Sequence, residues 1–471
     1  MPSQIPLVQL DRTLYDLYSI DGGDPNEVAH VLALAPPNGS ASSSLPENLK
    51  YTFQSPMAPN LDNGIFARIC LGNGSQNHAF MAGPIQLYLF DIDPPEHDVI
   101  NGTVESPPAH HTDAQRNYNA LVSSQRPRLS FIQNPNRFKP NKGVKASPYP
   151  PLDFLDNHPT VVSQDAHYRL MSKRDLALSG LPTPKTQVIE GRLSPTEALD
   201  DTLVEAEAQR IIQAVRDRST PFVIKFPQSL AGQGVFVVRD EATKANRIRL
   251  LELEVPRMIR RLTPDNAHLQ PVSLLLQDCV DGDTRNQSIF VTRSGRAEFV
   301  STAEQFLDAE GIWRASILDY KRQGELEQMY RGVIDKVAAY VHSKGFYGPM
   351  GCDVMTDSKG NQYVVDLNVR LTGDYMMGPL RGHFYARRGL RYSYLITPLA
   401  VLGNRDRFEQ RFEKELTEGR MVIVGWARGK KGKHEYSICS VVIGGKDHEH
   451  VLELADRVNA IALPKPEQTQ P

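Results

Sequence analysis

A cluster of polar residues near position 360 carries the clearest chemical pattern in the sequence. Asp353 is followed, thirteen residues later, by Asp366, and Asn368 and Arg370 continue at alternating positions. Apolar runs on both sides of the turn-like sequence TDSKGN predict a β-hairpin. Residues two apart on a strand point to the same face, so the three alternating residues form one row that Asp353 can face from the other strand.

Two carboxylates, an amide oxygen and a guanidinium in one place suit the binding of Mg²⁺ and phosphate. Oxygen ligands without sulfur or imidazole favour Mg²⁺, and Asp353, Asp366 and Asn368 can share two ions that bridge the β- and γ-phosphates of ATP. Arg370 would then stabilise charge on the transferred phosphoryl group. The alternative is a solvated polar strand edge, which the flanking apolar residues YVV and CDVM disfavour.

A second pattern combines a lysine with a glycine-containing loop. Lys225 ends the apolar run PFVIK, and the loop SLAGQG, residues Ser229–Gly234, follows before a further apolar run. A lysine beside such a loop offers a point charge and backbone N–H groups to phosphates, and the glycines allow close approach and a hinge. Taken alone, the lysine also fits a solvated strand edge and the loop an ordinary hairpin turn.

In order and spacing, these segments resemble the ATP-grasp enzymes. The metal-binding pattern of that family is Asp, Glu or Gln, then about a dozen residues, then Glu-x-Asn-x-Arg. The segment MSKRDLALSGLPTP resembles the family's first ATP lysine and the stop that follows it, which assigns that lysine to Lys173. The resemblance assigns Lys225 to the α- and β-phosphates, and it makes Ser229, Gly232 and Gly234 part of the loop that covers the triphosphate.

The segment LLLQDCVDGDTRNQSIFV resembles the family's adenine hinge. Gln277 stands at the usual acidic position, and the backbone at Asp278 and Val280 would meet the adenine edge. The ribose-binding residue would be Asp283 or Thr284.

The resemblance implies an enzyme that transfers the γ-phosphate of ATP to a carboxylate and joins the acyl phosphate to an amine, releasing ADP and phosphate. Arg370 and Lys225 would be the catalytic residues, and ATP and two Mg²⁺ ions the cofactors, with Mn²⁺ as a substitute. The partners would be a small carboxylic acid and an amine, amino acids among the candidates, and a homodimer is common among such enzymes. Candidates for holding the acid are Lys321, Arg381, Arg387 and Arg388.

Two alternatives stay open. One is a small-molecule kinase that ends at phosphoryl transfer to a hydroxyl. The other is an ATP-binding regulatory protein without catalysis, suggested by Gln277 and by Asp366, which stands where the family usually has the longer Glu. A fainter likeness connects the chain with ATP-grasp proteins of fungal secondary-metabolite pathways.

The elements around these motifs predict an α/β (α+β) class, and the resemblance implies an ATP-grasp fold with an N-terminal α/β pre-ATP-grasp domain and a small C-terminal βα extension. Apolar residues at helical spacing predict helices over Asp201–Asp217 and Glu325–His342. The Pro-rich segment 134–151 is expected to be a linker, because repeated prolines fit neither a helix nor a central strand. Short apolar runs predict strands at Val31–Leu34, Ile85–Phe90, Phe222–Lys225, Val235–Val238, Ser273–Gln277, Cys352–Met355, Gln362–Asp366, Met421–Trp426 and Tyr436–Ile443.

Six regions are expected along the chain. They are an N-terminal pre-ATP-grasp and substrate domain (1–150), a central linker and helical part (151–220), the ATP-grasp small subdomain (221–282), the large subdomain with the metal site (283–410), the C-terminal extension (411–462) and a disordered tail (463–471).

Composition sets limits on class and partners. The chain has 471 residues, 40% of them hydrophobic and 23% charged, which predicts a soluble protein of several domains. A net charge of −2 gives no field that would draw it to nucleic acid or an anionic membrane. The four scattered cysteines suggest neither disulfides nor a zinc site. No signal peptide or membrane span is visible, so a cytoplasmic location is expected.

Overall fold

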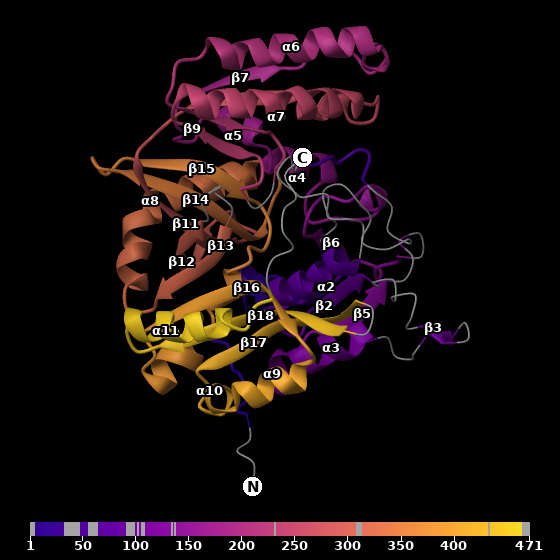
Figure 1. Cartoon of the computed structure of the whole chain (residues 1–471). Helices are drawn as coiled ribbons and strands as arrows, with labels where there is room; N and C mark the ends of the chain where they lie inside the picture. The colour runs from indigo at the N-terminus through magenta and orange to yellow at the C-terminus, as the bar shows by residue number, and fades with distance from the viewer. Residues whose placement is uncertain are drawn as a thin grey trace.

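The computed structural model describes residues 5–32, 48–54, 65–90, 99–100, 103–104, 109–132, 135, 138–229, 232–307, 313–431 and 434–463. These residues form a four-stranded parallel sheet, a four-stranded antiparallel sheet, an eight-stranded antiparallel sheet and a short β3–β4 hairpin (Val99–Ile100, Thr103–Val104) (Figure 1). The predicted mixed α/β class is confirmed. Within the described residues, no helix is long and apolar enough to cross a bilayer.

The N-terminal sheet has the strand order β5-β2-β1-β6, and all of its pairings are parallel. Every residue of β1 is buried, as expected for a parallel strand covered on both faces. After β1 the chain adds β2 and then β5 on one side of β1, and it later adds β6 on the other side. The strand order therefore reverses between β1 and β6. The elements are α1 (Leu14–Tyr18), β1 (Val28–Leu32), α2 (Ile65–Ala79), β2 (Gln86–Phe90), α3 (Ala109–Tyr118), β5 (Arg128–Ile132) and β6 (Lys145–Pro148).

The linker predicted at 134–151 is wrong for the residues of β6. Strand β6 pairs with β1 from Val28↔Lys145 to Val31↔Pro148, and Ala146 is fully buried. The proline is tolerated because it is the last residue of a strand at the edge of the sheet. Residues 134, 136 and 137 lie outside the described residues.

The small sheet has the strand order β7-β10-β8-β9 and is antiparallel throughout. The predicted hairpin of β8 and β9 and the predicted helix α6 are confirmed with the expected bounds. Figure 1 shows α6 and α7 together at one end of the molecule. The elements are β7 (Thr186–Glu190), α6 (Asp201–Asp217), β8 (Phe222–Lys225), β9 (Val235–Val238), α7 (Glu241–Arg260) and β10 (Ser273–Asp278).

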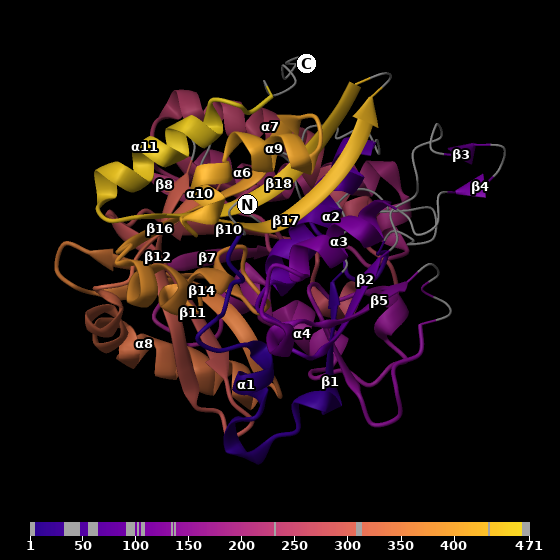
Figure 2. The same ribbon diagram turned by 90° about the horizontal axis from the view of Figure 1, so that it is seen from below.

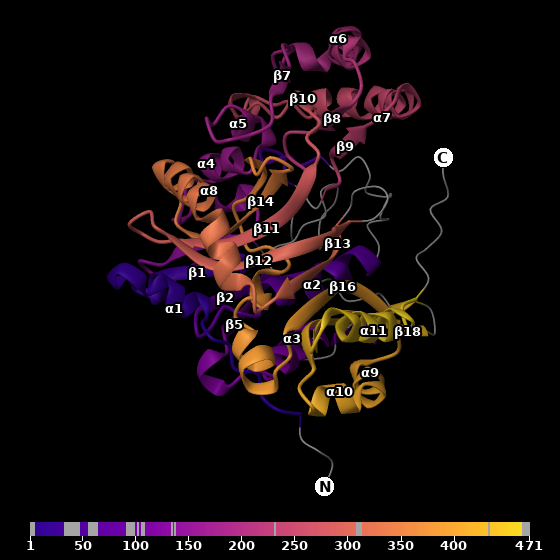
Figure 3. The same ribbon diagram turned by 90° about the vertical axis from the view of Figure 1, so that its left-hand side faces the viewer.

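The large sheet has the strand order β15-β14-β11-β12-β13-β16-β18-β17. Figure 3 shows α8 outside the β11–β14 part, and α11, α9 and α10 beside the strands β16–β18. The elements are β11 (Gly282–Val291), β12 (Ala297–Leu307), β13 (Trp313–Asp319), α8 (Gln323–Ser343), β14 (Gly348–Asp357), β15 (Gln362–Asn368), β16 (Tyr392–Leu402), α9 (Arg405–Arg411), α10 (Glu413–Thr417), β17 (Met421–Lys431), β18 (His434–Gly445) and α11 (His448–Asn459). Two short helices, α4 (Gln164–Leu170) and α5 (Lys173–Ala177), precede the small sheet.

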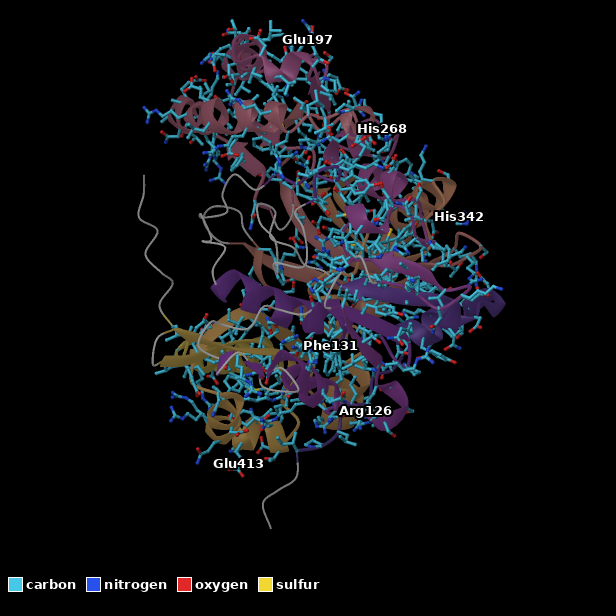
Figure 4. The ribbon with its side chains drawn as sticks, turned by 90° about the vertical axis from the view of Figure 1, so that its right-hand side faces the viewer. Arg126, Phe131, Glu197, His268, His342 and Glu413 are labelled. Atoms are coloured by element: carbon cyan, nitrogen blue, oxygen red, sulfur yellow. The ribbon has the colours of Figure 1, made fainter. Side chains whose placement is uncertain are left out.

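The N-terminal sheet and the large sheet share one hydrophobic core. That core joins Leu14 and Leu87 to Met376, Val422 and Val424, and Figure 2 shows α2 and α3 lying next to β17. In contrast, the small sheet has its own core with α6 and α7. Figure 4 shows Glu197, beside the small sheet, and Glu413, on α10, at opposite ends of the molecule.

Candidate active site

The two aspartates of the hairpin lie directly opposite each other. Asp353 on β14 and Asp366 on β15 are paired Cα partners, and Gly351 is the partner of Asn368. The pairing follows from the turn between the strands and from a register shift next to Asp353. The structure therefore brings Asp353 and the row of Asp366 and Asn368 to one spot.

Arg370 follows β15 and closes this row. Its Nη2 donates to Asn368 Oδ1 at 2.8 Å, and its guanidinium carbon lies 4.7 Å from the centre of the Tyr149 ring. The side chain is 8% exposed. Among the described residues no carboxylate oxygen lies within 4.0 Å of its nitrogens, so this guanidinium is a buried cation without an ion-pair partner.

Two lysines reach the same strand from other elements. Lys173 begins α5, and its Nζ lies 3.1 Å from Asp366 Oδ1. Lys225 ends β8, and its Nζ donates to Val365 O at 2.8 Å. Burial lowers the pKa of Lys225 to about 8, although the nearby charge of Asp366 acts in the opposite direction. Cations from the small-sheet side thus meet the carboxylates of the large sheet.

Asp353 is held by two side chains that the sequence analysis did not identify. Asn286 Nδ2 on β11 and Gln305 Nε2 on β12 each donate to Asp353 Oδ1 at 3.1 Å. Burial, and then the charge of Asp366, raise the pKa of Asp353. A bound cation would relieve both effects, because it stabilises the ionised carboxylate.

Asp374 is a further buried carboxylate near the row. Its Oδ2 accepts from Ser316 at 2.9 Å and its Oδ1 accepts from Thr372 at 2.7 Å. Burial raises its pKa, and these two hydrogen bonds act against that effect. The signal was present in the sequence, since Thr372 and Asp374 continue the alternation that starts at Asp366.

The residue that precedes the predicted phosphate loop, Gln228, is fixed by hydrogen bonds to Gln54. Gln54 and Gln228 form two reciprocal hydrogen bonds, from Gln54 N to Gln228 O at 2.7 Å and from Gln228 N to Gln54 Oε1 at 2.8 Å. The next residue, Ser229, accepts from Lys173 Nζ through its carbonyl at 2.8 Å. Its hydroxyl is buried without a partner among the described residues. The loop therefore presents a free hydroxyl beside an ammonium group.

Glycine is required in this loop for two separate reasons. Gly232 has φ +77°, a region that L side chains rarely adopt. At Gly234 a Cβ would lie 2.5 Å from the Cβ of Ser229. Leu230 and Ala231, within the predicted loop, lie outside the described residues.

The predicted adenine hinge connects the small sheet to the large one. Gln277 is buried on β10 and donates to Thr186 Oγ1 at 2.9 Å, and Val280 lies in the connection to β11. Thr284 is partly buried and pairs with Met355 on β14.

Two hinge residues already have partners in the protein. The Asp278 N–H donates to Lys185 O at 2.8 Å, so it is not free for a base. Asp283 is exposed and forms an ion pair with Arg285.

The four basic candidates for the acid do not contact the row in the described structure. Lys321 is exposed after β13. Arg381 lies over the Tyr385 ring, Arg387 donates to Gln9, and Arg388 donates to Glu418 O. The interactions of the three arginines hold the segment around the short π-helix Gly382–Ala386.

The side-chain oxygens of Asp353, Asp366 and Asn368 suit a hard divalent cation that is also coordinated by a bound substrate. Among the described residues, no group of three or more His, Cys, Asp or Glu side chains has metal-binding geometry. Asp353, Asp366 and Asn368 offer two carboxylates and one amide oxygen. This small oxygen set suits Mg²⁺, which usually keeps waters and takes phosphate oxygens as further ligands.

No known family profile matches the sequence, and no curated protein sequence is detectably similar to it. Similar solved structures include an L-amino acid ligase from Bacillus licheniformis, with 10% identity, 93% of this chain and 98% of that chain covered, and a TM-score of 0.49. Phosphoribosylamine–glycine ligase from Thermotoga maritima has 12% identity, coverages of 93% and 97%, and a TM-score of 0.46. N5-carboxyaminoimidazole synthase from Aspergillus clavatus, solved with ADP and 5-aminoimidazole ribonucleotide, has 11% identity, coverages of 92% and 99%, and a TM-score of 0.45. At such identities, function must be inferred from the residues of this chain.

Proposed function

We propose that this chain is an ADP-forming, ATP-dependent carboxylate–amine ligase of the ATP-grasp type. The observation that carries the proposal is the convergence at β15. There, Lys173 and Lys225 come from the small-sheet side, and they meet Asp353, Asp366 and Asn368 from the large sheet. Cations and a glycine loop on one side, with oxygen ligands on the other, form a site for a triphosphate with its metal ions.

In this mechanism each group has a separate task. Lys173 and Lys225 hold the phosphates, and the loop at Ser229–Gly234 excludes water that would hydrolyse the intermediate. Asp353, Asp366 and Asn368 would hold Mg²⁺, which neutralises charge on the phosphates when bound.

A carboxylate oxygen attacks the γ-phosphorus of ATP, and ADP leaves. Arg370 stabilises the charge of the acyl phosphate that forms. An amine then attacks the acyl carbon, phosphate leaves, and the amine loses a proton as the amide forms.

The test is a coupled assay with purified protein. It would contain Mg-ATP, pooled amino and aryl acids, and hydroxylamine as a trapping amine, with mass spectrometry of nucleotides and hydroxamates. We expect ADP and an acid-dependent hydroxamate. Formation of AMP and pyrophosphate would contradict the proposal, and a phosphorylated alcohol without hydroxamate would identify a kinase.

A further inference from the structure

A short segment of the connection between β1 and α2 packs far from the N-terminal sheet to which it belongs in the chain. This segment is residues 48–54, which we call the strap. Tyr51 and Phe53 of the strap lie in the hydrophobic core that α8 forms with β11, β14 and β15. Cys352, next to Asp353 in β14, belongs to the same core. Because successive strand residues point to opposite faces, the strap is anchored behind the metal row.

The last residue of the strap holds the segment from which the phosphate loop starts. Gln54 N donates to Gln228 O at 2.7 Å, and Gln54 Oε1 accepts from Gln228 N at 2.8 Å. The Gln54 amide also donates to Pro271 O at 3.4 Å, just before β10. Gln228 is 2% exposed, so water cannot replace these bonds if they are lost. The strap therefore connects the core of the large sheet to the small-sheet side.

A buried tyrosine on α4 completes this attachment. Tyr168 OH donates to Thr52 O at 2.6 Å, and Tyr168 O accepts from Gln228 Nε2 at 2.6 Å. The Tyr168 ring packs against the rings of Tyr51 and Phe53, with centroid distances of 5.5 and 5.8 Å. The strap, α4 and Gln228 thus form a closed ring of contacts, in which none of the three can shift without breaking bonds to the other two.

The residue that follows Gln228 contacts the lysine that reaches the metal row. Lys173 Nζ lies 2.8 Å from Ser229 O and 3.1 Å from Asp366 Oδ1. The Ser229 hydroxyl is buried without a partner among the described residues, so it is available to a phosphate oxygen. A displacement of Gln228 by about 1 Å would disturb both groups, and misplacements of that size can cost about 10²-fold in rate.

We propose that Gln54 is a positioning residue for ATP, through which the strap sets the distance between the phosphate loop and the metal row. The inference rests on the proposed function, because it takes Ser229 and Lys173 to bind the triphosphate. Gln54 acts through the backbone of Gln228 and touches no ligand itself. Its effect therefore falls on the phosphates of ATP and spares the nucleoside, which the loop does not hold.

The test compares the affinity for MgATP, measured by calorimetric titration, with the affinity for adenosine, measured by ligand-observed NMR. Gln54→Met keeps the length of the side chain and the bond from Gln54 N, but it removes the acceptor for Gln228 N. We expect the Kd for MgATP to increase about tenfold and the Kd for adenosine to change less than about twofold, because one buried hydrogen bond at the loop is lost.

A second glutamine provides the matched control for Gln54. Gln125 Oε1 accepts from Leu10 N at 2.8 Å, and Leu10 is as buried as Gln228. Gln125→Met removes the same kind of bond away from the site and should change neither affinity. An equal loss of MgATP and adenosine affinity in Gln54→Met would show that Gln54 only supports the fold, and it would overturn the proposal.

A milder variant tests the strap at its other attachment. Tyr168→Phe removes only the hydroxyl that holds Thr52 O, and we expect the Kd for MgATP to increase about threefold. Tyr320→Phe is its control, because the hydroxyl of this buried tyrosine donates to Met377 O at 2.9 Å. Unchanged MgATP affinity in both Gln54→Met and Tyr168→Phe would also overturn the proposal.

These binding measurements separate the role of the strap from the ligase reaction. If MgATP binding weakens selectively in the strap variants but the unchanged protein forms no ADP with any acid, the ligase fails and the positioning role stands. If the unchanged protein does not bind MgATP at all, both proposals are overturned.

Discussion

At the scale of single residues, Lys225 shows how burial sets the chemistry of the site. Its side chain is 5% exposed, and burial lowers its pKa to about 8 from the ordinary 10.5. The ammonium group therefore loses its proton as the pH rises through about 8. We expect the affinity of the metal-free protein for ATP to fall about tenfold between roughly pH 7.5 and 9.5, as a charged hydrogen bond to phosphate is lost. Calorimetric titration with ATP across this range would measure it.

The control for Lys225 retains the charge at every pH. Lys225→Arg carries a guanidinium, which stays protonated, so its ATP affinity should be flat over the same range. A flat profile for the unchanged protein would contradict the assignment of Lys225 to the phosphates.

The lowered pKa of Lys225 also makes the free energy of unfolding depend on pH, in the opposite direction to the ATP affinity. Between about pH 8 and 10.5 the unfolded chain binds the proton more tightly than the folded one, so the stability contributed by this group increases with pH.

Asp366 lies between a lysine and the second carboxylate of the site. Its Oδ1 lies 3.1 Å from Lys173 Nζ, and its Cα is paired with that of Asp353. Asp366→Asn removes the negative charge that would hold Mg²⁺, and we expect Mg-dependent ADP formation to fall about 10²–10³-fold. Asp335→Asn on the outer face of α8 is the control and should keep full activity. Removal of Mg²⁺ with EDTA should abolish ADP formation in the unchanged protein. An active Asp366→Asn would contradict the metal assignment.

The sequence predicted the side chains of one hairpin better than those that support them. Alternation along one strand placed Asp366 and Asn368 together, because strand periodicity is local. Asn286 and Gln305 were missed because their contacts with Asp353 depend on the pairing of strands far apart in the chain. A single sequence contains no direct record of such pairing.

At the scale of elements, the β8–β9 loop is held by close packing as well as by hydrogen bonds. Gly234 has no room for a side chain, because its Cβ would lie 2.5 Å from that of Ser229. Gly234→Ala should therefore displace Ser229 from Lys173 and raise the KM for ATP about tenfold, with a smaller effect on the KM for the acid.

A glycine elsewhere provides the matched control for that loop. Gly332 lies inside α8, and a Cβ there would meet nothing within 4 Å. Gly332→Ala should leave the KM for ATP unchanged and stabilise the protein by about 0.5–1 kcal/mol, measurable by urea denaturation. Equal effects of the two substitutions on the KM for ATP would show that the loop has no special role.

The helices that the sequence predicted and the strands that it missed differ in which kinds of side chain they bury. Helices α6 and α8 each bury one apolar stripe, so their periodicity is plain in the sequence. Strands β11, β12 and β13 carry polar residues such as Asn286, Gln305 and Ser316 toward the site. Those residues interrupt the apolar pattern that would have marked the strands. The polar residues that the site requires therefore make the strands that carry them harder to recognise in the sequence.

At the scale of the whole molecule, the N-terminal sheet is joined to the large sheet by buried polar contacts as well as by the shared core. Gln76 on α2 donates to Trp426 O at 2.8 Å and accepts from Trp426 N at 3.1 Å. Asn117 on α3 donates to Val424 O at 2.8 Å. These contacts use backbone groups of β17 that no further strand satisfies, since β17 is the last strand of its sheet.

We therefore expect the N-terminal and large sheets to unfold as one cooperative unit. Gln76→Ala leaves the buried N–H and C=O of Trp426 without partners, which should lower the free energy of unfolding by about 2–4 kcal/mol. Hydrogen-exchange mass spectrometry should show peptides of β1 and β18 losing protection together, in the variant as in the unchanged protein. Gln115→Ala, on the exposed side of α3, should change neither. Earlier exchange in β1 than in β18 would mean that the N-terminal sheet opens alone.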